Sequence, residues 1–231
     1  ALAERDLLLT TVAPHLVRPV PFLYPLRHRV WERAFVGAGI ALYDVLATFR
    51  VHRRHKMLKP SSVVERVPEL QHQGLTGAAF YYDAMTHDAF LTVAMVEDAV
   101  NHGAFCANYL GYEGAVYRAG KVVGARLRDR ETNELFNVDT PWIVHAAGPY
   151  TDDVQARAGL VGSPMVRPTK GVHIAVRREK LPLDVALVMS SRRDHRVTFA
   201  LPWGAVTAIG TTDTDHTESV YDVHADLDDV D

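Results

Sequence analysis

KVVGARLRDRETNELFNVDTPWIVHAAGPYTDDV, residues 121–154, has the pattern of three short strands followed by a turn into a helix. Apolar residues alternate with charged ones along 122–129, and Thr132–Glu134 has turn chemistry. Apolar residues return in Leu135–Val138. The pattern predicts a β-meander.

The third run of this stretch, Trp142–Ala147, is apolar and ends at Gly148-Pro149. Thr151 then stands where it can cap a helix that begins with two aspartates. A buried strand that delivers small residues to a helix start suits a large planar cofactor, because such a cofactor can approach the backbone there and its oxygens can meet amide groups. We therefore expect a cofactor site at this turn.

A dinucleotide-binding unit normally begins with a strand, a G-x-G-x-x-G turn and a helix, and no such unit precedes Lys121. The nearest match is Gly37-Ala38-Gly39, but Leu42 occupies the third glycine position. The surrounding AFVGAGIALYDVL has the spacing of one amphipathic helix. We predict a helix here and no phosphate loop.

Composition indicates an ordinary globular chain. With 231 residues, 48% of them hydrophobic, it can bury a core in one large domain or two modest ones. A net charge of -3 gives no case for nucleic-acid binding, and the basic run Arg50–Lys59 is either a solvated connector or a patch for anionic lipid or phosphate. The single cysteine, Cys106, excludes an internal disulfide framework, and the twelve histidines lack metal-site spacing, so no metal site is predicted.

The two ends of the sequence suggest an internal piece of a longer protein. The chain starts in a helical pattern without an initiator Met or signal peptide, and it ends in the acidic DVHADLDDVD. No apolar run is long enough to span a bilayer, because Asp44 interrupts the best candidate. Any membrane contact is therefore expected to be peripheral.

Periodicity predicts the remaining elements and two functional layers. We expect a cofactor-binding layer from residues 77–160 and a substrate platform from the rest, with residues 1–76 as its helical and connector segment and residues 161–231 as its antiparallel strands. The expected helices are 2–12, 31–48, a short capped helix starting at Ser61-Ser62 and ending before Pro68, and 88–102; extended backbone is expected over 15–28, and strands over 77–83, 104–110, 172–176, 185–189, 197–201 and 205–210.

Four motifs occur in a characteristic order: AAGPYTDDV (146–154), RPTKGVHIAV (167–176), FALPWG (199–204) and IGTTDTD (209–215). With them the chain resembles the FAD-dependent glycerol-3-phosphate dehydrogenases, a branch of the group that includes the amino-acid oxidases. The resemblance implies a mixed α/β (α+β) fold: part of an FAD/NAD(P)-binding domain of the glutathione-reductase/amino-acid-oxidase type, with an antiparallel substrate-binding sheet. It also implies an internal fragment that lacks the N-terminal G-x-G-x-x-G segment and the C-terminal part.

The family reaction moves a hydride from the secondary carbinol of sn-glycerol 3-phosphate to FAD, yields dihydroxyacetone phosphate and passes the electrons to membrane quinone. The resemblance implies a cytoplasmic or organellar, peripherally membrane-associated protein that is not secreted, and it is compatible with a homo-oligomer. Two alternatives stay open. One is a related flavin oxidase or dehydrogenase that uses oxygen, and the other is a catalytically silent fragment or binding module.

The substrate-site predictions lie in the KG-x-H and GTTD motifs. His173 corresponds to a substrate-site histidine of the family, and a histidine near neutral pKa is suited to accept the hydroxyl proton. Thr211 and Thr212 are predicted as catalytic and substrate-binding hydroxyls, against the alternative of a tight turn. Lys170 is predicted to offer charge to the anionic substrate or to the flavin, although an exposed strand-end lysine would look the same.

The cofactor-site predictions lie in two backbone segments. In the family, the strand end that corresponds to Leu110 and Gly111 passes the adenine half of FAD largely through its backbone. Ala146, Ala147 and Gly148 supply the small residues that close approach of a flavin requires, although small residues at such a turn also occur for packing alone.

Overall fold

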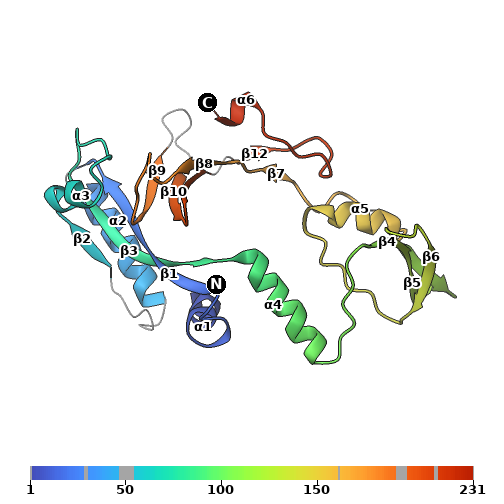
Figure 1. The fold of residues 1–231 in the computed structure, drawn as a ribbon. Helices are drawn as coiled ribbons and strands as arrows, with labels where there is room; N and C mark the ends of the chain where they lie inside the picture. Colours follow the sequence, from blue (N-terminus) through green and yellow to red (C-terminus); the bar gives the residue numbers. More distant parts are fainter. Residues whose placement is uncertain are drawn as a thin grey trace. The chain divides into compact units, whose positions relative to one another are not determined.

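The computed structural model describes residues 2–28, 31–46, 55–160, 162–190, 197–210 and 213–230. The chain forms two compact units (Figure 1). Unit 1 comprises Ala1–Met95, Gly171–Thr212 and Asp228–Asp231, and unit 2 comprises Val96–Lys170 and Asp213–Leu227. The boundaries predicted after residues 76 and 160 separate a cofactor-binding layer from a substrate platform. That division by function stays a prediction.

Unit 1 is built on a seven-stranded mixed sheet with the strand order β2-β3-β1-β9-β10-β11-β8. The last four strands of this order pair antiparallel, so the predicted antiparallel platform is present, with each strand within two residues of its expected bounds. They are β8 (His173–Arg177), β9 (Ala186–Ser190), β10 (Val197–Trp203) and β11 (Val206–Gly210).

The proline-rich segment forms the interior strand β1 (Val17–Leu26), which pairs antiparallel with β3 (Gly77–Thr86) over ten residues. Pro19, Pro21 and Pro25 stand at alternate positions, so all three withhold an N–H from the same side of the strand. The ladder with β3 is unbroken, and the parallel ladder with β9 comprises only two residue pairs. Proline therefore limits pairing on the β9 side, and the short β2 (Lys56–Leu58) completes the sheet beside β3.

The core of unit 1 lies between this sheet and α3 (Pro60–Arg66), whose Val63 is fully buried. The predicted serine cap is wrong. The helix begins at Pro60 without a side-chain cap, because proline has no N–H to satisfy and its φ is already helical. The buried core residues are Leu23, Val63, Val67, Ala78, Phe80, Leu183, Val185, Leu187 and Ala200.

Two further helices of unit 1 follow the predicted ranges. Helix α1 (Leu2–Leu7) continues as the π-helical turn η1 (Leu8–Val12). Helix α2 (Trp31–Leu46) contains both glycines of the partial G-x-G motif, which confirms the prediction of a helix in place of a phosphate loop.

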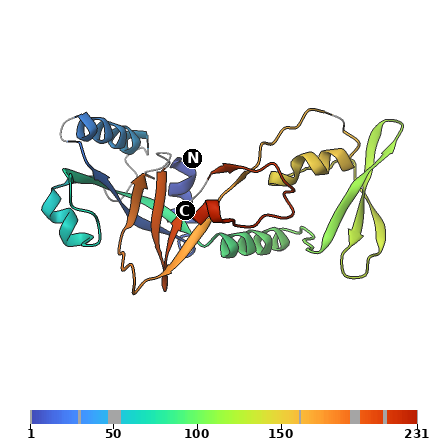
Figure 2. The ribbon, with the colours of Figure 1, turned by 90° about the horizontal axis from the view of Figure 1, so that it is seen from above.

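Unit 2 contains an antiparallel meander of β4 (Leu110–Arg118), β5 (Lys121–Asp129) and β6 (Leu135–Asp139), drawn light green to yellow in Figure 2. Strands β5 and β6 follow the predicted pattern, but the remaining strand is β4, which was not predicted. Helix α4 (Asp88–Asn101) precedes it, beginning in unit 1 and ending in unit 2. The one-turn η2 (Gly148–Tyr150) and α5 (Thr151–Arg157) follow it.

Two predicted strands of unit 2 are wrong. Residues 104–109 and 142–147 are not strands, and no described strand pairs with either run. The apolar side chains of Phe105, Trp142 and Val144 are instead more than four-fifths exposed. A strand needs a hydrogen-bonded partner, and an apolar pattern alone does not supply one.

A short ladder of β7 (Thr169–Lys170) and β12 (Thr214–Asp215) also belongs to unit 2, and α6 (Leu227–Val230) ends the described chain. Among the residues that the structure describes, no helix is both long and apolar enough to cross a membrane.

Candidate functional site

The two backbone segments predicted to hold the cofactor lie next to each other in unit 2. Tyr112 directly follows Gly111, and His145 directly precedes Ala146. The rings of Tyr112 and His145 meet edge to face with centroids 5.1 Å apart. The structure therefore brings together the start of β4 and the small-residue turn after residue 145.

The small-residue turn is open. Gly148 has φ +54°, a conformation that favours glycine, and no heavy atom lies within 4 Å of the position that a Cβ would take there. Thr151 does not cap α5 as predicted, because it lies in the first turn of the helix and its hydroxyl donates to the Gly148 carbonyl (2.7 Å). The space beside the Gly148 backbone is therefore open, next to the start of a helix.

The Tyr112 hydroxyl is a buried polar group that no described residue hydrogen-bonds. Burial, and secondarily the neighbouring Tyr117, raises the pKa of Tyr112. Leaving a buried hydroxyl unpaired costs about 1–3 kcal/mol, so folded proteins usually provide it with an acceptor. A planar ligand with polar edges at the adjacent turn fits this orphan donor and the open backbone.

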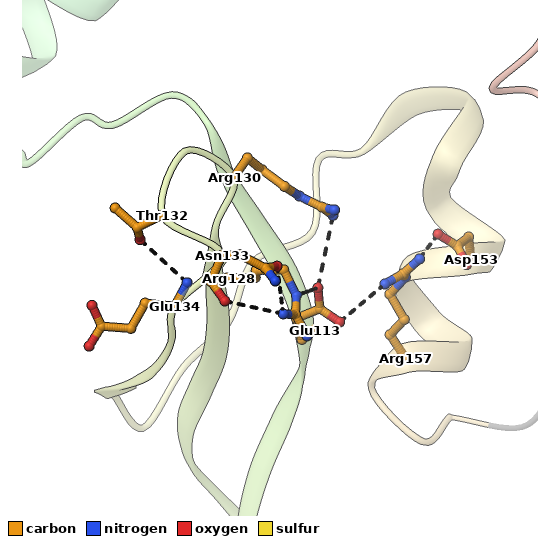
Figure 3. A network of polar contacts seen from close by, with 8 residues as sticks. All are labelled: Glu113, Arg128, Arg130, Thr132, Asn133, Glu134, Asp153 and Arg157. Carbon is orange, nitrogen blue, oxygen red and sulfur yellow. Dashed lines mark hydrogen bonds and ion pairs between the residues drawn. The ribbon is translucent and has the colours of Figure 1, made fainter.

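Glu113 is the centre of a charged cluster that joins β4, β5 and α5 (Figure 3). Its carboxylate lies 2.9 Å from Arg128 Nε, 3.6 Å from Arg157 Nη1 and 3.9 Å from Arg130 Nη2. We call Glu113, Arg128, Arg130 and Arg157 the arginine hub. Glu113 is the extra residue of a β-bulge between the pairs at Tyr112 and Gly114, and a bulge re-aims a side chain out of the regular alternation.

Glu113 of the hub and Asp153 on α5 should make the stability of unit 2 depend on acid pH. The hydrogen bond from Arg128, followed by the charges of Arg128, Arg130 and Arg157, lowers the pKa of Glu113. A hydrogen bond from Tyr221, supported by Arg157, lowers the pKa of Asp153. Unfolded Glu and Asp titrate near about 4.3 and 3.9, so the stabilisation is complete above that range and is lost as pH falls through the lower folded values.

We therefore expect Glu113→Gln to be less stable than the unsubstituted chain at pH 7, with a difference that narrows as pH falls below about 4. Chemical denaturation at a series of pH values from 7 to 2.5 measures the free energy of unfolding of both proteins. A difference between them that stays constant with pH would show that the charge of Glu113 does not contribute to stability.

Close backbone approach also fixes α5 to the meander. A Cβ at Gly114 would lie 2.8 Å from the Arg157 carbonyl oxygen, and Gly114 has φ +152°. The Tyr117 hydroxyl donates to the Ala158 carbonyl at 2.9 Å. Because α5 follows the small-residue turn directly, these contacts hold that turn in place against β4.

Side-chain contacts to α5 and to residues 167–170 hold the segment Asp213–Leu227 in unit 2, in addition to the β7–β12 ladder. The Tyr221 hydroxyl donates to Asp153 on α5 (2.5 Å), and its ring lies 4.9 Å from that of Tyr150. Arg167 pairs with Asp215, and Lys170 Nζ lies 2.7 Å from Asp226 Oδ2.

The ion pair with Asp226 bears on the predicted role of Lys170. Its side chain is 11% exposed, so the charge that was expected to meet the substrate or flavin is already neutralised inside unit 2. A substrate contact would require this pair to open, and the role stays a prediction. Sequence reasoning did not find Asp226, because one aspartate in an acidic tail carries no distinguishing pattern.

In unit 1, His173 begins β8 opposite Gly210 on β11. A Cβ at Gly210 would lie 2.5 Å from His173 Cδ2 and 3.0 Å from Cγ, so only glycine lets the ring lie against this strand. The ring atoms nearest the strand are carbons, and no described residue hydrogen-bonds either ring nitrogen. The His173 side chain is exposed among the described residues, and its role stays a prediction. Thr211 and Thr212 lie outside the described residues, and their roles stay predictions.

The arginine hub was missed by the sequence analysis. Charged residues that alternate along a strand are usually solvated, and Glu113 gave no sign of its partners. The only available signal was Gly114, since glycine inside a strand pattern often marks a bulge. Within the described ranges, no group of three or more His, Cys, Asp or Glu residues could hold a metal ion.

Comparison with known proteins decides the family. The family described as FAD dependent oxidoreductase (DAO) matches residues 1–231, which is the whole chain. The chain belongs to the FAD-dependent oxidoreductase family. Its mixed main sheet and small antiparallel sheet match those of a solved relative complexed with FAD.

That solved relative is the glycerol-3-phosphate dehydrogenase from Bacillus halodurans complexed with FAD, which matches this oxidoreductase with a TM-score of 0.81 and 27% identity, over 100% of this chain and 41% of its own. The chain is also 38% identical over 215 residues to glycerol-3-phosphate dehydrogenase of Mycobacterium leprae and 34% identical over 220 residues to the mitochondrial enzyme of Mus musculus. These matches cover 93% of the chain but 36% and 30% of the two relatives. The chain thus spans about a third of the length of the curated relatives it matches.

Proposed function

We propose that the protein in which these 231 residues occur oxidises sn-glycerol 3-phosphate to dihydroxyacetone phosphate with FAD as hydride acceptor. The observation that carries the proposal is the 34–38% identity to glycerol-3-phosphate dehydrogenases over 93% of the chain. The family match covers residues 1–231, which include both cofactor segments of unit 2 and the His173–Gly210 pair of unit 1.

His173 is the proposed general base. Oxidation of a secondary alcohol removes a hydride from carbon and a proton from oxygen, and a ring nitrogen of His173 accepts that proton. Gly210 lets the ring carbons lie against β11, which fixes the ring while both nitrogens stay unused by described residues. Thr211 and Thr212 are proposed to donate their hydroxyls to substrate oxygens, and Lys170 to meet the phosphate once its pair with Asp226 opens.

FAD supplies the hydride-accepting ring system when it is bound. Leu110 and Gly111 are proposed to contact its adenine half, and Ala146, Ala147 and Gly148 to admit it close to the backbone. The open Gly148 and the orphan Tyr112 hydroxyl support this assignment, since both are features that a bound cofactor would complete. The hub and the Gly114 contact hold these two segments at a fixed separation.

Quinone is the proposed electron acceptor, reached by peripheral contact with a membrane. Trp31, Phe35 and Leu42 on α2 are 59–76% exposed. At 3.6 residues per turn they fall within about 40° of one another, which makes a narrow apolar stripe. A helix with such a stripe can lie in the headgroup region of a bilayer. Half of the basic run Arg50–Lys59, residues 50–54, lies outside the described residues.

The double variant Trp31→Ser/Phe35→Ser should lose binding to anionic lipid vesicles, because it removes the two largest apolar side chains of the stripe. Vesicle co-sedimentation measures the bound fraction. The control is Phe105→Ser, which removes a phenylalanine of unit 2 that is even more exposed than Phe35. If both variants lost vesicle binding equally, or if neither variant lost it, a membrane role for α2 would be contradicted.

Steady-state assays test the proposal and its alternatives. We expect sn-glycerol 3-phosphate to support reduction of a soluble quinone analogue, with slow peroxide formation in air. Fast oxygen consumption with little quinone reduction would favour an oxidase of the same family. A protein that binds FAD but turns over with neither acceptor would support the silent-module alternative.

A further inference from the structure

The segment Asp213–Leu227 brings many negative charges to Lys170. We call this segment the acidic strap, because it contains no lysine or arginine and five carboxylates: Asp213, Asp215, Glu218, Asp222 and Asp226. Its first strand, β12, pairs with β7 and places Thr214 opposite Lys170. Its end returns to the same lysine, where Asp226 Oδ2 lies 2.7 Å from Lys170 Nζ. The strap therefore meets Lys170 at both of its ends.

The ion pair between Lys170 and Asp226 is accessible mainly from the aspartate side. The Lys170 side chain is 11% exposed, whereas that of Asp226 is 54% exposed. Lys170 Nζ also donates to the His224 carbonyl oxygen, at 3.4 Å. Little of the ammonium surface is left for a second anion, and two anions at one ammonium would repel each other. An anion that reaches Lys170 from solvent therefore has to replace the Asp226 carboxylate.

The strap is anchored before Asp226 and exposed near it. The Tyr221 hydroxyl donates to Asp153 (2.5 Å), and the β7–β12 ladder holds the other end. Every residue from 221 to 227 is exposed. Segments that bury few side chains open locally at a low cost in free energy. The last residues of the strap can thus leave Lys170 while Tyr221 and β12 stay in place.

We propose that Asp226 competes with the substrate phosphate for Lys170, so that the end of the strap opens when substrate binds. This deepens the proposed function and rests on it, because it requires Lys170 to meet the phosphate of sn-glycerol 3-phosphate. A phosphate monoester carries a charge of about −1.5 to −2 and three acceptor oxygens, whereas a carboxylate carries a single charge. The phosphate therefore replaces Asp226 at the ammonium, and uncharged glycerol does not. Asp226 thus weakens the binding of anions and raises the KM for the charged substrate.

The test uses the full-length protein in which these residues occur, loaded with FAD and assayed at a fixed concentration of a soluble quinone analogue. Asp226→Asn keeps the size of the side chain but removes its charge. We expect it to lower the KM for sn-glycerol 3-phosphate about two- to fivefold, the range for a partly exposed ion pair, with kcat unchanged. The Ki of inorganic phosphate as a competitive inhibitor should fall by the same factor.

Two further variants show where Asp226 acts. Asp222→Asn removes the same charge from the same strap, but the Asp222 side chain is 88% exposed and pairs with His224, so KM and Ki should stay unchanged. Lys170→Ala should raise both constants. Adding Asp226→Asn to Lys170→Ala should have no further effect, because the competition requires the ammonium.

Each other outcome counts against the proposal. Unchanged KM and Ki in Asp226→Asn would mean that the ion pair is structural, and the proposed function would stand. A raised KM would make Asp226 a positioning residue for Lys170. An equal fall in Asp222→Asn would assign the effect to the overall charge of the strap. If the unsubstituted protein does not oxidise sn-glycerol 3-phosphate, the proposed function fails, and the competition at Lys170 fails with it.

Discussion

Turnover with sn-glycerol 3-phosphate is expected to fall by about 10²- to 10⁴-fold in the His173→Ala variant, the range that a positioned general base supplies. The flavin should stay bound, because His173 lies in unit 1 and both cofactor segments lie in unit 2. Stopped-flow flavin reduction and the flavin content of the purified protein measure the two effects separately.

Two variants sharpen this test. Gly210→Ala keeps the imidazole but pushes it off β11, so turnover should fall by less than in His173→Ala, with flavin content unchanged. His102→Ala removes an exposed histidine directly after α4 and should leave turnover unchanged. If His173→Ala instead lost flavin while turnover per remaining flavin was normal, His173 would not be the base.

The second large effect is expected in unit 2. Gly114→Ala should lower the free energy of unfolding by about 2–3 kcal/mol, since alanine is strained at φ +152° and its Cβ would collide with the Arg157 carbonyl. The collision should also separate α5 from β4 and weaken FAD binding at the adjacent turn. Chemical denaturation and amide hydrogen exchange along α5 measure these changes.

Gly120→Ala is the matched control in the same meander. Its φ is +75°, so alanine is disfavoured there as well, but no heavy atom lies within 4 Å of the new Cβ. The expected loss is about 1 kcal/mol, without faster exchange in α5. Equal losses in the two variants would mean that the contact between β4 and α5 does not hold the helix.

Local pattern predicted the elements whose partners are near in sequence. The β5–β6, β9–β10 and β10–β11 pairs follow from alternation and turns, because each hairpin brings its own partner. Helix α2 followed from its spacing in the same way. The family followed from four ordered motifs, which no periodicity could have supplied.

Features that depend on distant partners were not predictable. Residues 104–109 and 142–147 have the composition of buried strands, but composition does not say which strand lies beside them. The ten-residue ladder of β1 with β3 joins segments about 60 residues apart, and its prolines argued only for extended backbone. The arginine hub joins β4 to α5 through a bulge, and a bulge displaces side chains from the alternation on which sequence patterns rest.

Anaerobic flavin reduction tests the proposed function most directly. The full-length protein in which these residues occur is loaded with FAD, and its visible flavin absorbance is followed without oxygen or quinone. We expect sn-glycerol 3-phosphate to bleach the flavin within one turnover and to yield one dihydroxyacetone phosphate per flavin, while sn-glycerol 1-phosphate and glycerol leave it oxidised. A bound flavin that stays oxidised with sn-glycerol 3-phosphate would contradict the assignment.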